Sequence, residues 1–385
     1  MKIAFDAYPI ASPQLSGVGM HAWQIARNLC AREDLSCELL LYDFLRRRGS
    51  AKILRERIPH TPIRQCNLLP YGIYVELWDF LPVLRPDLLF RTGADIYHFF
   101  NFVVPPRVKG YVVNTVHDLV YLTYPQTMQK ANFRRLHKHL ARSCQNSDII
   151  IAVSENGKRE LIELMGIDKA KIRVVSNGVD LGRFHSDIPP EEVVAFRQRH
   201  GLPADYFLYI GTLEPRKNIP NLLRAYAAGQ LRFGGCKLVL AGAKGWEYKE
   251  IFKLVEELHL QNEVVFTGYL PSAELAYLYA GAQAFLFPSY YEGFGMPPLE
   301  AMACGVPVMT SNRSSLPEVV GDSGILVEPE DLGQMANAME RLLTDTELRQ
   351  TCRERGIARA GQFTWERSAD AVFQIYQELM GERKD

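Results

Sequence analysis

Two carboxylates, Glu292 and Glu300, stand eight residues apart in a stretch that runs from residue 287 to residue 308. The stretch reads Phe-Pro-Ser-Tyr-Tyr-Glu-Gly-Phe-Gly-Met-Pro-Pro-Leu-Glu-Ala-Met-Ala-Cys-Gly-Val-Pro-Val. Gly293 and Gly295 allow the backbone to approach a ligand closely, and free N–H groups at a helix start attract anions. A carboxylate can accept two hydrogen bonds from a vicinal diol such as a ribose. The pattern therefore indicates a site for a nucleotide that carries a sugar.

The surrounding residues predict the elements that position these two acids. Residues 284–287 predict a buried strand, and the glycine-rich turn follows it. The proline pair at 297–298 suits the first turn of a helix, where a missing N–H costs little, so we expect Glu300 in that first turn. Gly305 suits a left-handed stop just past the helix, and residues 306–310 predict the next strand.

The same stretch resembles the donor site of the retaining family-4 glycosyltransferases. The resemblance rests on the two acids around Gly-Phe-Gly and on the run Ala-Met-Ala-Cys-Gly-Val-Pro-Val that follows. It implies that Glu300 holds the donor ribose and that Glu292, with Gly293, Phe294 and Gly295, faces the donor sugar and diphosphate. Taken singly, Glu300 could merely complement the helix dipole, and Glu292 could be a solvated turn residue.

Two adjacent cations, Arg216 and Lys217, follow a predicted strand at 206–210 and a glycine turn. A lysine supplies a point charge and an arginine a fork of donors, and both suit a diphosphate. The alternative is a pair of solvated loop residues. The family pattern has an arginine directly after the glycine, where this chain has Thr212. The resemblance therefore implies that Arg216 and Lys217 share the diphosphate and leaves open which cation meets which phosphate.

A second turn, formed by Gly268, Tyr269 and Leu270, follows a predicted strand at 264–266. The resemblance places the nucleobase of the donor against the backbone of this turn. From the residues alone, an ordinary connection between a strand and a helix is equally acceptable.

Two glycines near the N-terminus, Gly17 and Gly19, precede a predicted helix at 21–31. Such glycines can meet a phosphate or a sugar at a helix start. The pattern is not the dinucleotide-binding fingerprint, because the third glycine is missing and the loop after the strand at 2–6 is too long. The resemblance implies that this loop reaches toward the donor diphosphate.

A histidine and an acid, His117 and Asp118, stand directly after a predicted parallel strand at 112–116. In open parallel sheets, ligands bind beyond the carboxyl ends of the strands. A lone histidine is more often structural, but the resemblance implies contact with the donor sugar. We assign His117 a positioning role, because a retaining reaction needs no base to activate a water.

The length of 385 residues exceeds one ordinary core and predicts two domains. The seven scattered cysteines form no Cys-x-x-Cys pair, so we expect neither a disulfide framework nor a structural zinc site. The first residues turn polar too early for a signal peptide, and no apolar run reaches the roughly 18 residues of a spanning helix. A cytoplasmic location is therefore expected.

The net charge of zero hides an asymmetry between the two halves. Residues 1–184 hold 25 Lys and Arg against 17 Asp and Glu, whereas residues 185–385 hold 19 against 27. A basic half suits an anionic ligand or an anionic membrane surface. Basic residues beside aromatics would suit membrane docking on the inner face of the membrane, but a solvated helix followed by core aromatics is the favoured interpretation. The residues concerned are Arg46, Arg47, Arg48, Lys52, Arg55, Arg57, Tyr71, Tyr74, Trp78 and Phe80. The basic helix predicted at 128–144 would suit a nucleic acid or, at least as well, an acceptor that carries phosphates, such as a lipid-linked glycan.

Alternating strands and helices predict an α/β chain with two Rossmann-like doubly wound domains facing a cleft, the GT-B type. We expect residues 1–184 and 365–385 to form the acceptor-side domain and residues 185–364 to form the nucleotide-sugar domain. The resemblance implies that the last helix crosses back to the first domain.

The predicted function is transfer of a sugar from a nucleotide-sugar to a glycan or lipid-linked acceptor with retention at the anomeric carbon. The runs at 117–119 and 214–218 look most like mannosyltransferases of bacterial surface polysaccharide assembly, so the donor expected first is GDP-mannose. No Asp-x-Asp pair occurs, so we expect no metal and no cofactor, and no motif indicates nucleic acid. UDP-sugar transferases, an epimerase or phosphorylase on the same plan, and a non-catalytic hinged sugar-binding protein stay open.

Overall fold

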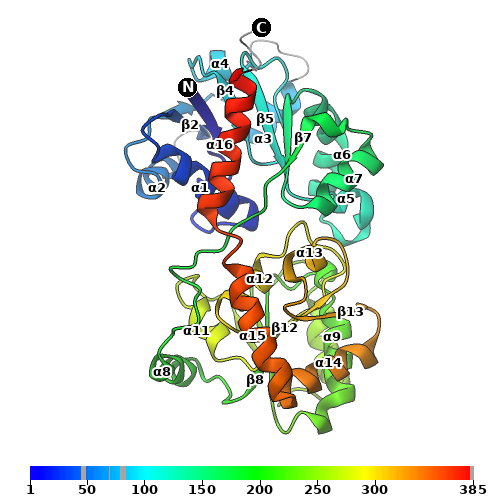
Figure 1. The fold of residues 1–385 in the computed structure, drawn as a ribbon. Helices are drawn as coiled ribbons and strands as arrows, with labels where there is room; N and C mark the ends of the chain where they lie inside the picture. The colour runs from blue at the N-terminus through cyan, green and yellow to red at the C-terminus, as the bar shows by residue number, and fades with distance from the viewer. Residues whose placement is uncertain (45–48, 69, 79–83, 382–385) are drawn as a thin grey trace. The chain divides into compact units, whose positions relative to one another are not determined.

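The computed structural model describes residues 1–44, 49–68, 70–78 and 84–381 and divides the chain into two compact units (Figure 1). Unit 1 consists of Met1–Leu122, Lys130–Gly178 and Trp365–Asp385, and unit 2 consists of Thr123–Gln129 and Val179–Thr364. The expected boundary at residue 184 lies slightly beyond this division. Arg46, Arg47, Arg48 and Phe80, which the sequence offered as membrane contacts, lie outside the described residues.

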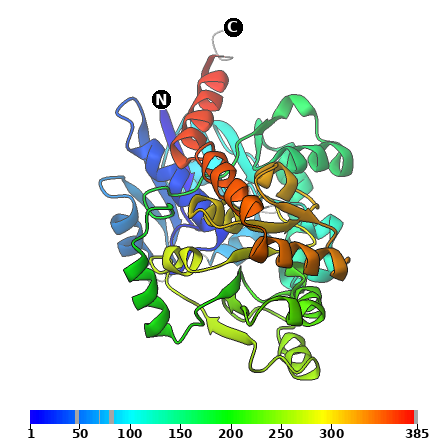
Figure 2. The same cartoon turned by 60° about the horizontal axis from the view of Figure 1, so that its bottom comes forward.

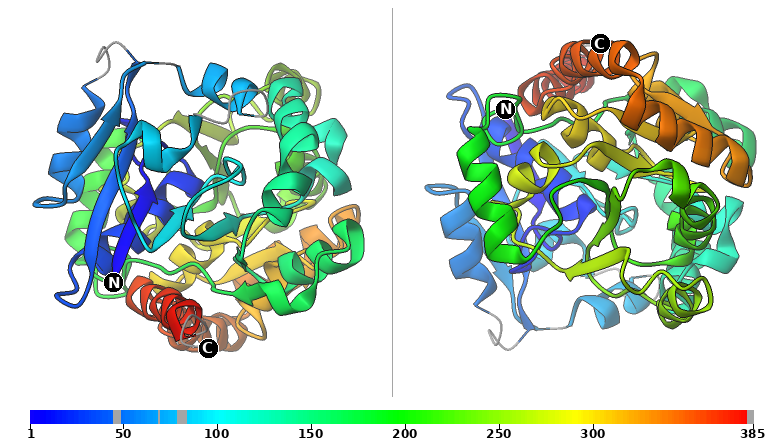
Figure 3. Two further views of the ribbon diagram at one scale, coloured as in Figure 1. Left: turned by 90° about the horizontal axis from the view of Figure 1, so that it is seen from above. Right: turned by 90° about the horizontal axis from the view of Figure 1, so that it is seen from below.

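The described strands of unit 1 form one parallel sheet in the order β3-β2-β1-β4-β5-β6-β7. Figure 3 (left) shows these strands side by side, from blue to green. They are short, apolar and largely buried, as expected for a sheet covered on both faces. Their bounds are β1 Lys2–Asp6, β2 Ser36–Tyr42, β3 Ile63–Cys66, β4 Ile96–Phe99, β5 Tyr111–Val116, β6 Ile149–Ala152 and β7 Ile172–Val174.

Helices connect these strands, and the last helix of the chain joins them. The described helices of unit 1 are α1 Gly17–Cys30, α2 Ser50–Arg57, α3 Tyr71–Leu77, α4 Pro86–Leu89, α5 Val120–Thr123, α6 Lys130–Gln145, α7 Glu155–Met165, η4 Lys169–Lys171 and α16 Trp365–Gly381. Helix α16 packs against α1, which confirms the predicted return of the C-terminal helix to the first domain (Figure 1). Its buried Tyr376 hydroxyl lies 2.6 Å from His98 Nδ1 on β4 and so ties the helix to the sheet.

The described strands of unit 2 form a second parallel sheet in the order β10-β9-β8-β11-β12-β13. Their bounds are β8 Tyr206–Ile210, β9 Lys237–Ala241, β10 Val264–Gly268, β11 Ala284–Phe287, β12 Val308–Ser311 and β13 Ile325–Val327. Helix α14 packs on α9, and α15 packs on α12 (Figure 2). The helices are η3 Pro125–Thr127, α8 Pro190–His200, η5 Pro215–Lys217, α9 Ile219–Gly229, η6 Gln230–Arg232, α10 Lys249–Glu257, α11 Leu275–Ala280, α12 Met296–Ala303, α13 Leu316–Val320, α14 Leu332–Thr344 and α15 Thr346–Ala360.

Each sheet has one point at which the strand order reverses. In unit 1 the chain leaves β1 toward β2 and β3, then returns to β4 on the other side of β1. In unit 2 it leaves β8 toward β9 and β10, then returns to β11 on the other side of β8. Ligands of doubly wound sheets bind at such reversals, beyond the carboxyl ends of the two central strands. The predicted α/β class with two Rossmann-like units is confirmed, and the reversals show where to look for sites.

Candidate active site

A cluster of charged side chains lies at the reversal of the second sheet. The Glu292 carboxylate accepts a hydrogen bond of 2.7 Å from Lys217 Nζ and one of 2.9 Å from Arg216 Nη1. Arg216 Nη2 also donates to Glu214 at 2.9 Å. Glu214, Lys217 and Glu292 are buried and Arg216 is largely buried, with 18% of its side chain exposed, so two cations and two carboxylates balance inside the protein. The structure thus brings together three residues that the sequence analysis proposed independently.

The cluster forms because β8 and β11 are neighbours in the sheet. Phe207 and Leu208 of β8 pair with Ala284 and Phe285 of β11, so the loops after the two strands meet. The backbone N–H of Tyr290 donates to the Arg216 carbonyl at 2.9 Å and fixes the two loops to each other. The order of the strands in the sheet, rather than a sequence motif, therefore brings Arg216 and Lys217 into contact with Glu292.

Asn218, to which the sequence analysis gave no role, stabilises the loops that carry the cluster. It adopts a left-handed backbone (φ 58°) between η5 and α9, and its side chain is buried. Its Nδ2 donates to the carbonyls of Pro288 and Pro329, at 3.0 and 2.6 Å. The sequence did offer a signal for this turn, because asparagine tolerates a positive φ better than most residues and stands here directly after the two cations.

Electrostatics inside the cluster favour its ionised form. Burial alone raises the pKa of Glu292, but the charges of Arg216 and Lys217 outweigh it and bring that pKa down to about 2. Burial lowers the pKa of Lys217, and Arg216 adds to this effect, while Glu292 and Glu214 oppose it. The carboxylate of Glu292 is therefore the counter-ion that keeps two buried cations charged.

The turn after Glu292 is held by two serines. The Glu292 N–H donates to Ser314 Oγ at 2.8 Å, and Ser315 Oγ donates to the carbonyls of Glu292 and Phe294, at 2.9 and 2.6 Å. Gly295 has a φ of 122°, and a Cβ there would lie 2.9 Å from Leu316 Cδ2. A glycine is thus required at this position, and Gly293 and Phe294 are carried by the same fixed turn.

Glu300 lies on α12 with its carboxylate 2.9 Å from the hydroxyl of Tyr279 at the end of α11. The helix begins at Met296, so Glu300 occupies its second turn. The expectation of a first-turn position was wrong, because the glycine turn ends earlier than the proline pair suggested. Burial raises the pKa of Glu300 to about 7, although the Tyr279 bond and the charge of Arg183 both lower it. The predicted left-handed stop at Gly305 is confirmed by its φ of 71°.

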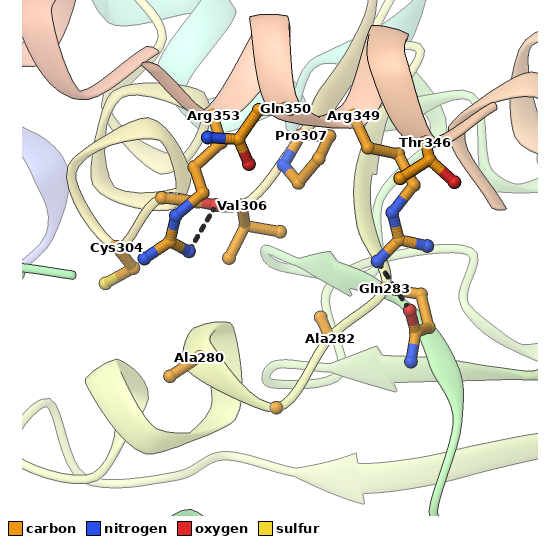
Figure 4. A pocket seen from close by; sticks show the side chains of 12 residues that line it. Ala280, Ala282, Gln283, Cys304, Val306, Pro307, Thr346, Arg349, Gln350 and Arg353 are labelled. Atoms are coloured by element: carbon orange, nitrogen blue, oxygen red, sulfur yellow. Dashed lines mark hydrogen bonds between the residues drawn. The ribbon is translucent and has the colours of Figure 1, made fainter. Parts of the chain in front are cut away.

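The far end of α12 borders a cavity of about 340 Å³ (Figure 4). Arg353 of α15 donates to the Gly305 carbonyl at 3.2 Å, and Arg349 donates to Gln283 Oε1 at 2.8 Å. A cation near the C-terminus of a helix complements its dipole. Arg353 therefore fixes the C-terminal end of α12, which carries Glu300, to α15, and Arg349 fixes α15 to the residue before β11.

The turn proposed for the nucleobase follows β10 at the edge of the same sheet. Gly268 has a φ of 70°, its carbonyl accepts a bond of 2.9 Å from the Gly242 N–H, and Leu270 is buried. Tyr269 is 55% exposed, so its ring is accessible to a ligand. The contact with a nucleobase stays a prediction.

In unit 1, His117 is buried just beyond the end of β5. Its Nε2 lies 2.8 Å from the Phe100 carbonyl, so Nε2 carries the proton and Nδ1 carries the lone pair. Burial lowers the pKa of His117 to about 4, although the Phe100 bond opposes this effect. A neutral imidazole in this tautomer can accept a hydrogen bond through Nδ1. This agrees with a positioning role, and its contact with the donor sugar stays a prediction.

His21 of α1 packs edge-on to His117, with 4.9 Å between ring centroids, and was missed by the sequence analysis. Its Nδ1 lies 2.8 Å from Asn177 Oδ1, and its Nε2 is buried without a partner among the described residues. Burial lowers its pKa well below the ordinary value, and the proximity of His117 adds to this effect. The sequence signal for His21 was its position two residues after Gly19, near the start of a predicted helix. An ordinary buried residue of that helix could occupy the same position.

The remaining residues predicted for unit 1 lie at helix starts. Gly17 begins α1, and the N–H of Gly19 donates to Ser16 Oγ at 3.2 Å, so the amide of Gly19 is already engaged. A Cβ at Gly19 would lie 2.7 Å from the Pro9 carbonyl, which explains that glycine by packing. Asp118 Oδ1 accepts a bond of 3.3 Å from the Val120 N–H. Roles for these three residues toward a donor stay predictions.

The aromatic residues offered as membrane contacts are mostly part of the core. Tyr74 and Trp78 are buried, and the Tyr74 hydroxyl donates to the Leu84 carbonyl at 2.9 Å. This supports the favoured interpretation of core aromatics. In the described residues we find no helix that combines the length and the apolar character needed to cross a bilayer.

Two doubly wound units, with a buried charge cluster at the reversal of the second sheet, match the class that the sequence predicts, the glycosyltransferases with two Rossmann-like domains. Comparison with known proteins agrees. Residues 15–183 match the model of Glycosyltransferase Family 4, and residues 194–359 match Glycosyl transferases group 1. The sucrose-phosphate synthase of Thermosynechococcus elongatus superposes with a TM-score of 0.79 over 99% of this chain and 100% of its own, at 25% identity.

Two sequence relatives are named mannosyltransferases. The O-antigen chain mannosyltransferase B of Escherichia coli is 34% identical, over 98% of this chain and 100% of its own length. The serotype-specific mannosyltransferase WbdA of Escherichia coli is 31% identical over 77% of this chain, which corresponds to 37% of its length. The chain belongs to the family-4 glycosyltransferases and is an enzyme of that family.

Proposed function

We propose that this glycosyltransferase moves mannose from GDP-mannose to a glycan or lipid-linked acceptor of a bacterial surface polysaccharide, with retention at the anomeric carbon. The observation that carries the proposal is the cluster of Arg216, Lys217 and Glu292 at the reversal of the second sheet. The choice of mannose is supported by the activity named for both sequence relatives.

The cluster suits a departing diphosphate. Breaking the bond between the anomeric carbon and the phosphate oxygen leaves negative charge on the diphosphate, and preorganised cations stabilise that charge. Lys217 donates one of its three N–H groups to Glu292, and an ammonium has three donors. Because Glu292 holds both cations in place, they need little reorganisation when the donor binds.

In the proposed reaction, the acceptor oxygen attacks the anomeric carbon from the side of the leaving diphosphate. The bond to the phosphate oxygen breaks, the bond to the acceptor oxygen forms, and the acceptor proton passes to the phosphate. Glu292 is fully engaged with two cations, which supports an electrostatic role over a nucleophilic one. We propose that Glu300 accepts hydrogen bonds from the ribose hydroxyls, with Tyr279 orienting its carboxylate.

A thermal-shift panel tests this function. The chain would be heated with GDP, UDP, ADP, GDP-mannose, UDP-glucose or UDP-N-acetylglucosamine, each with and without EDTA. We expect a shift with GDP and GDP-mannose that EDTA leaves unchanged, since Arg216 and Lys217 supply the positive charge. A shift confined to uridine nucleotides would transfer the proposal to a UDP-sugar donor. No shift with any nucleotide would contradict a nucleotide-sugar site and favour the hinged sugar-binding alternative.

A further inference from the structure

Two of the seven cysteines lie in contact with each other, and both are partly open to solvent. Cys30 is the last residue of α1, and Cys37 is the second residue of β2. Their side chains are hydrogen-bonded to each other, and Cys37 Sγ lies 3.9 Å from the Leu29 carbonyl oxygen. Both side chains are half-buried. The other five cysteines are buried: Cys66, Cys144, Cys236, Cys304 and Cys352. The two thiols that a small reagent can reach are therefore the two that already touch.

The local fold holds the two thiols together. Cys37 lies beside Ile3 in the register of β2 with β1, and α1 packs on β2, so the end of the helix lies next to the start of the strand. A disulfide requires the two sulfurs to approach to about 2 Å. Thiols in contact need only a rotation of their side chains for this. Both cysteines also stand at the ends of their elements, where the backbone adjusts most easily.

The contact gives the two thiols different reactivity. The hydrogen bond from Cys37 lowers the pKa of Cys30, burial opposes this effect, and a hydrogen bond from Thr61 adds to it. The same contact with Cys30 raises the pKa of Cys37, and burial raises it further. The thiolate is the nucleophilic form of cysteine. Cys30 is therefore the thiol that attacks first, and Cys37 is placed to react with the product.

The connection between the two cysteines, residues 31–35, is a surface on which α16 packs. The guanidinium of Arg32 lies over the ring of Phe373, 3.8 Å from its centroid. Burial raises the pKa of Tyr376, and Cys37 and Cys30 add to this effect, so the phenol of Tyr376 lies near both thiols. A covalent bond between the cysteines would therefore restrain the chain at the place where α16 is held.

We propose that Cys30 and Cys37 form an oxidation site, at which hydrogen peroxide produces a disulfide that stabilises the packing of α16. The Cys30 thiolate attacks one peroxide oxygen, the O–O bond breaks, and the first water leaves a sulfenic acid on Cys30. The Cys37 thiol attacks that sulfur, the S–S bond forms, the S–O bond breaks and a second water leaves. Two electrons pass from the two thiols to one peroxide. This modification does not depend on the proposed transferase activity.

Peptide mapping tests the site. The full chain would be treated with hydrogen peroxide, unfolded in iodoacetamide to alkylate every free thiol, and digested with trypsin without reduction. Trypsin cleaves after Arg32, so a disulfide would join the peptide 28–32 to the peptide 33–46. We expect this linked pair, lighter than the two free peptides together by two hydrogen atoms, and its loss after treatment with dithiothreitol. The five buried cysteines should all be alkylated.

Hydrogen exchange measures the effect on α16. A disulfide restricts the chain when a contact opens locally, so the amides of α16 should exchange roughly 2- to 10-fold more slowly in the oxidised chain than in the reduced chain. Cys37→Ser, treated in the same way, should show no such difference, and its Cys30 should carry a sulfenic acid that dimedone traps. This variant also controls for the oxidation of methionines.

Cys66→Ser is the matched control, because Cys66 also lies on a strand of the first sheet but is buried. It should form the linked pair as the wild-type chain does. Alkylation of both Cys30 and Cys37 after peroxide treatment of the wild-type chain contradicts the inference, and so does a disulfide from either of them to a buried cysteine. A linked pair with unchanged exchange in α16 contradicts it as well. These readouts come from the wild-type chain and hold even if a variant does not fold.

Discussion

The ammonium of Lys217 lies 2.7 Å from the carboxylate of Glu292, and each side chain is about nine-tenths buried. The two residues are far apart in the chain and come from the loops after β8 and β11. Arg216 shares the same carboxylate, so removal of any one partner changes the charge balance of the whole cluster.

Lys217→Met should lower the free energy of unfolding by about 3 kcal/mol at pH 7, because it takes one of the two cations from a buried carboxylate. The fold keeps Glu292 ionised, with a pKa lowered from 4.5 to about 2. The contribution of ionised Glu292 to the free energy of unfolding is therefore fully present above about pH 4.5 and is lost as the pH falls toward 2. Urea unfolding between pH 3 and pH 7 measures both effects. The double variant Lys217→Met, Glu292→Gln should regain part of the loss, and wild-type stability in the single variant would contradict the prediction.

Nucleotide affinity should fall at acid pH through Glu300. Its pKa is raised to about 7, and only the ionised carboxylate accepts two ribose hydroxyls. GDP should therefore bind about tenfold more weakly at pH 6 than at pH 8, beyond any effect of the phosphates themselves. Calorimetric titration at several pH values measures this.

Two variants isolate the contribution of Glu300. Glu300→Gln should bind GDP weakly with a flatter pH dependence, and Tyr279→Phe should move the midpoint upward, because the Tyr279 bond lowers the pKa of Glu300. Equal pH slopes in the wild-type chain and in Glu300→Gln would show that another group titrates.

Gly295→Ala should destabilise the chain by roughly 1–3 kcal/mol and weaken nucleotide binding. Its φ of 122° suits glycine, and the new methyl would meet Leu316 at 2.9 Å. Relief of the clash moves the turn that carries Glu292. Gly333→Ala is the control, because Gly333 lies in α14 with only an ordinary contact of 3.4 Å, so it should be neutral or slightly stabilising. Thermal unfolding with and without GDP gives both quantities, and equal behaviour of the two variants would refute the strain argument.

The rate of transfer should show no inflection from His117 between pH 5 and pH 8. Burial lowers its pKa to about 4, so the imidazole stays neutral over this range. As the pH falls, His117 is protonated in the unfolded chain before it is protonated in the folded chain. The contribution of neutral His117 to folding stability, which is fully present above about pH 6.5, should therefore be lost as the pH falls toward 4.

A substitution tests the positioning role of His117. His117→Asn should slow transfer about 10- to 100-fold with unchanged GDP affinity, as loss of a hydrogen bond to the sugar predicts. A pH–rate profile of the wild-type chain and a GDP titration of the variant provide the measurements. An inflection near pH 6.5 that disappears in His117→Asn would assign the histidine an acid–base role.

The donor-side cluster was predictable residue by residue, but its internal pairing was not. Glycines, prolines and adjacent cations are local signals, and they located Glu292, Arg216 and Lys217 at strand ends. The contact between them depends on β8 lying beside β11, which no local pattern specifies. The second-turn position of Glu300 was missed for a local reason instead. The first residue of a helix is uncertain by one or two positions, even where a proline pair marks the first turn.

The residues missed in unit 1 had weaker signals. His21 follows a helix start at a spacing that any core residue could have, and its partner Asn177 lies 156 residues away in the sequence.

The C-terminal helix α16 has a consequence for the order in which the chain can fold. The last described element belongs to unit 1, whereas nearly all of unit 2 lies in one continuous segment from Val179 to Thr364. That segment precedes α16, so all residues of unit 2 are synthesised before the helix that packs on α1 and bonds to His98. The first sheet therefore gains its last helix only after both units have been made. Until Tyr376 arrives, the nascent first half keeps an apolar surface uncovered that chaperones can recognise.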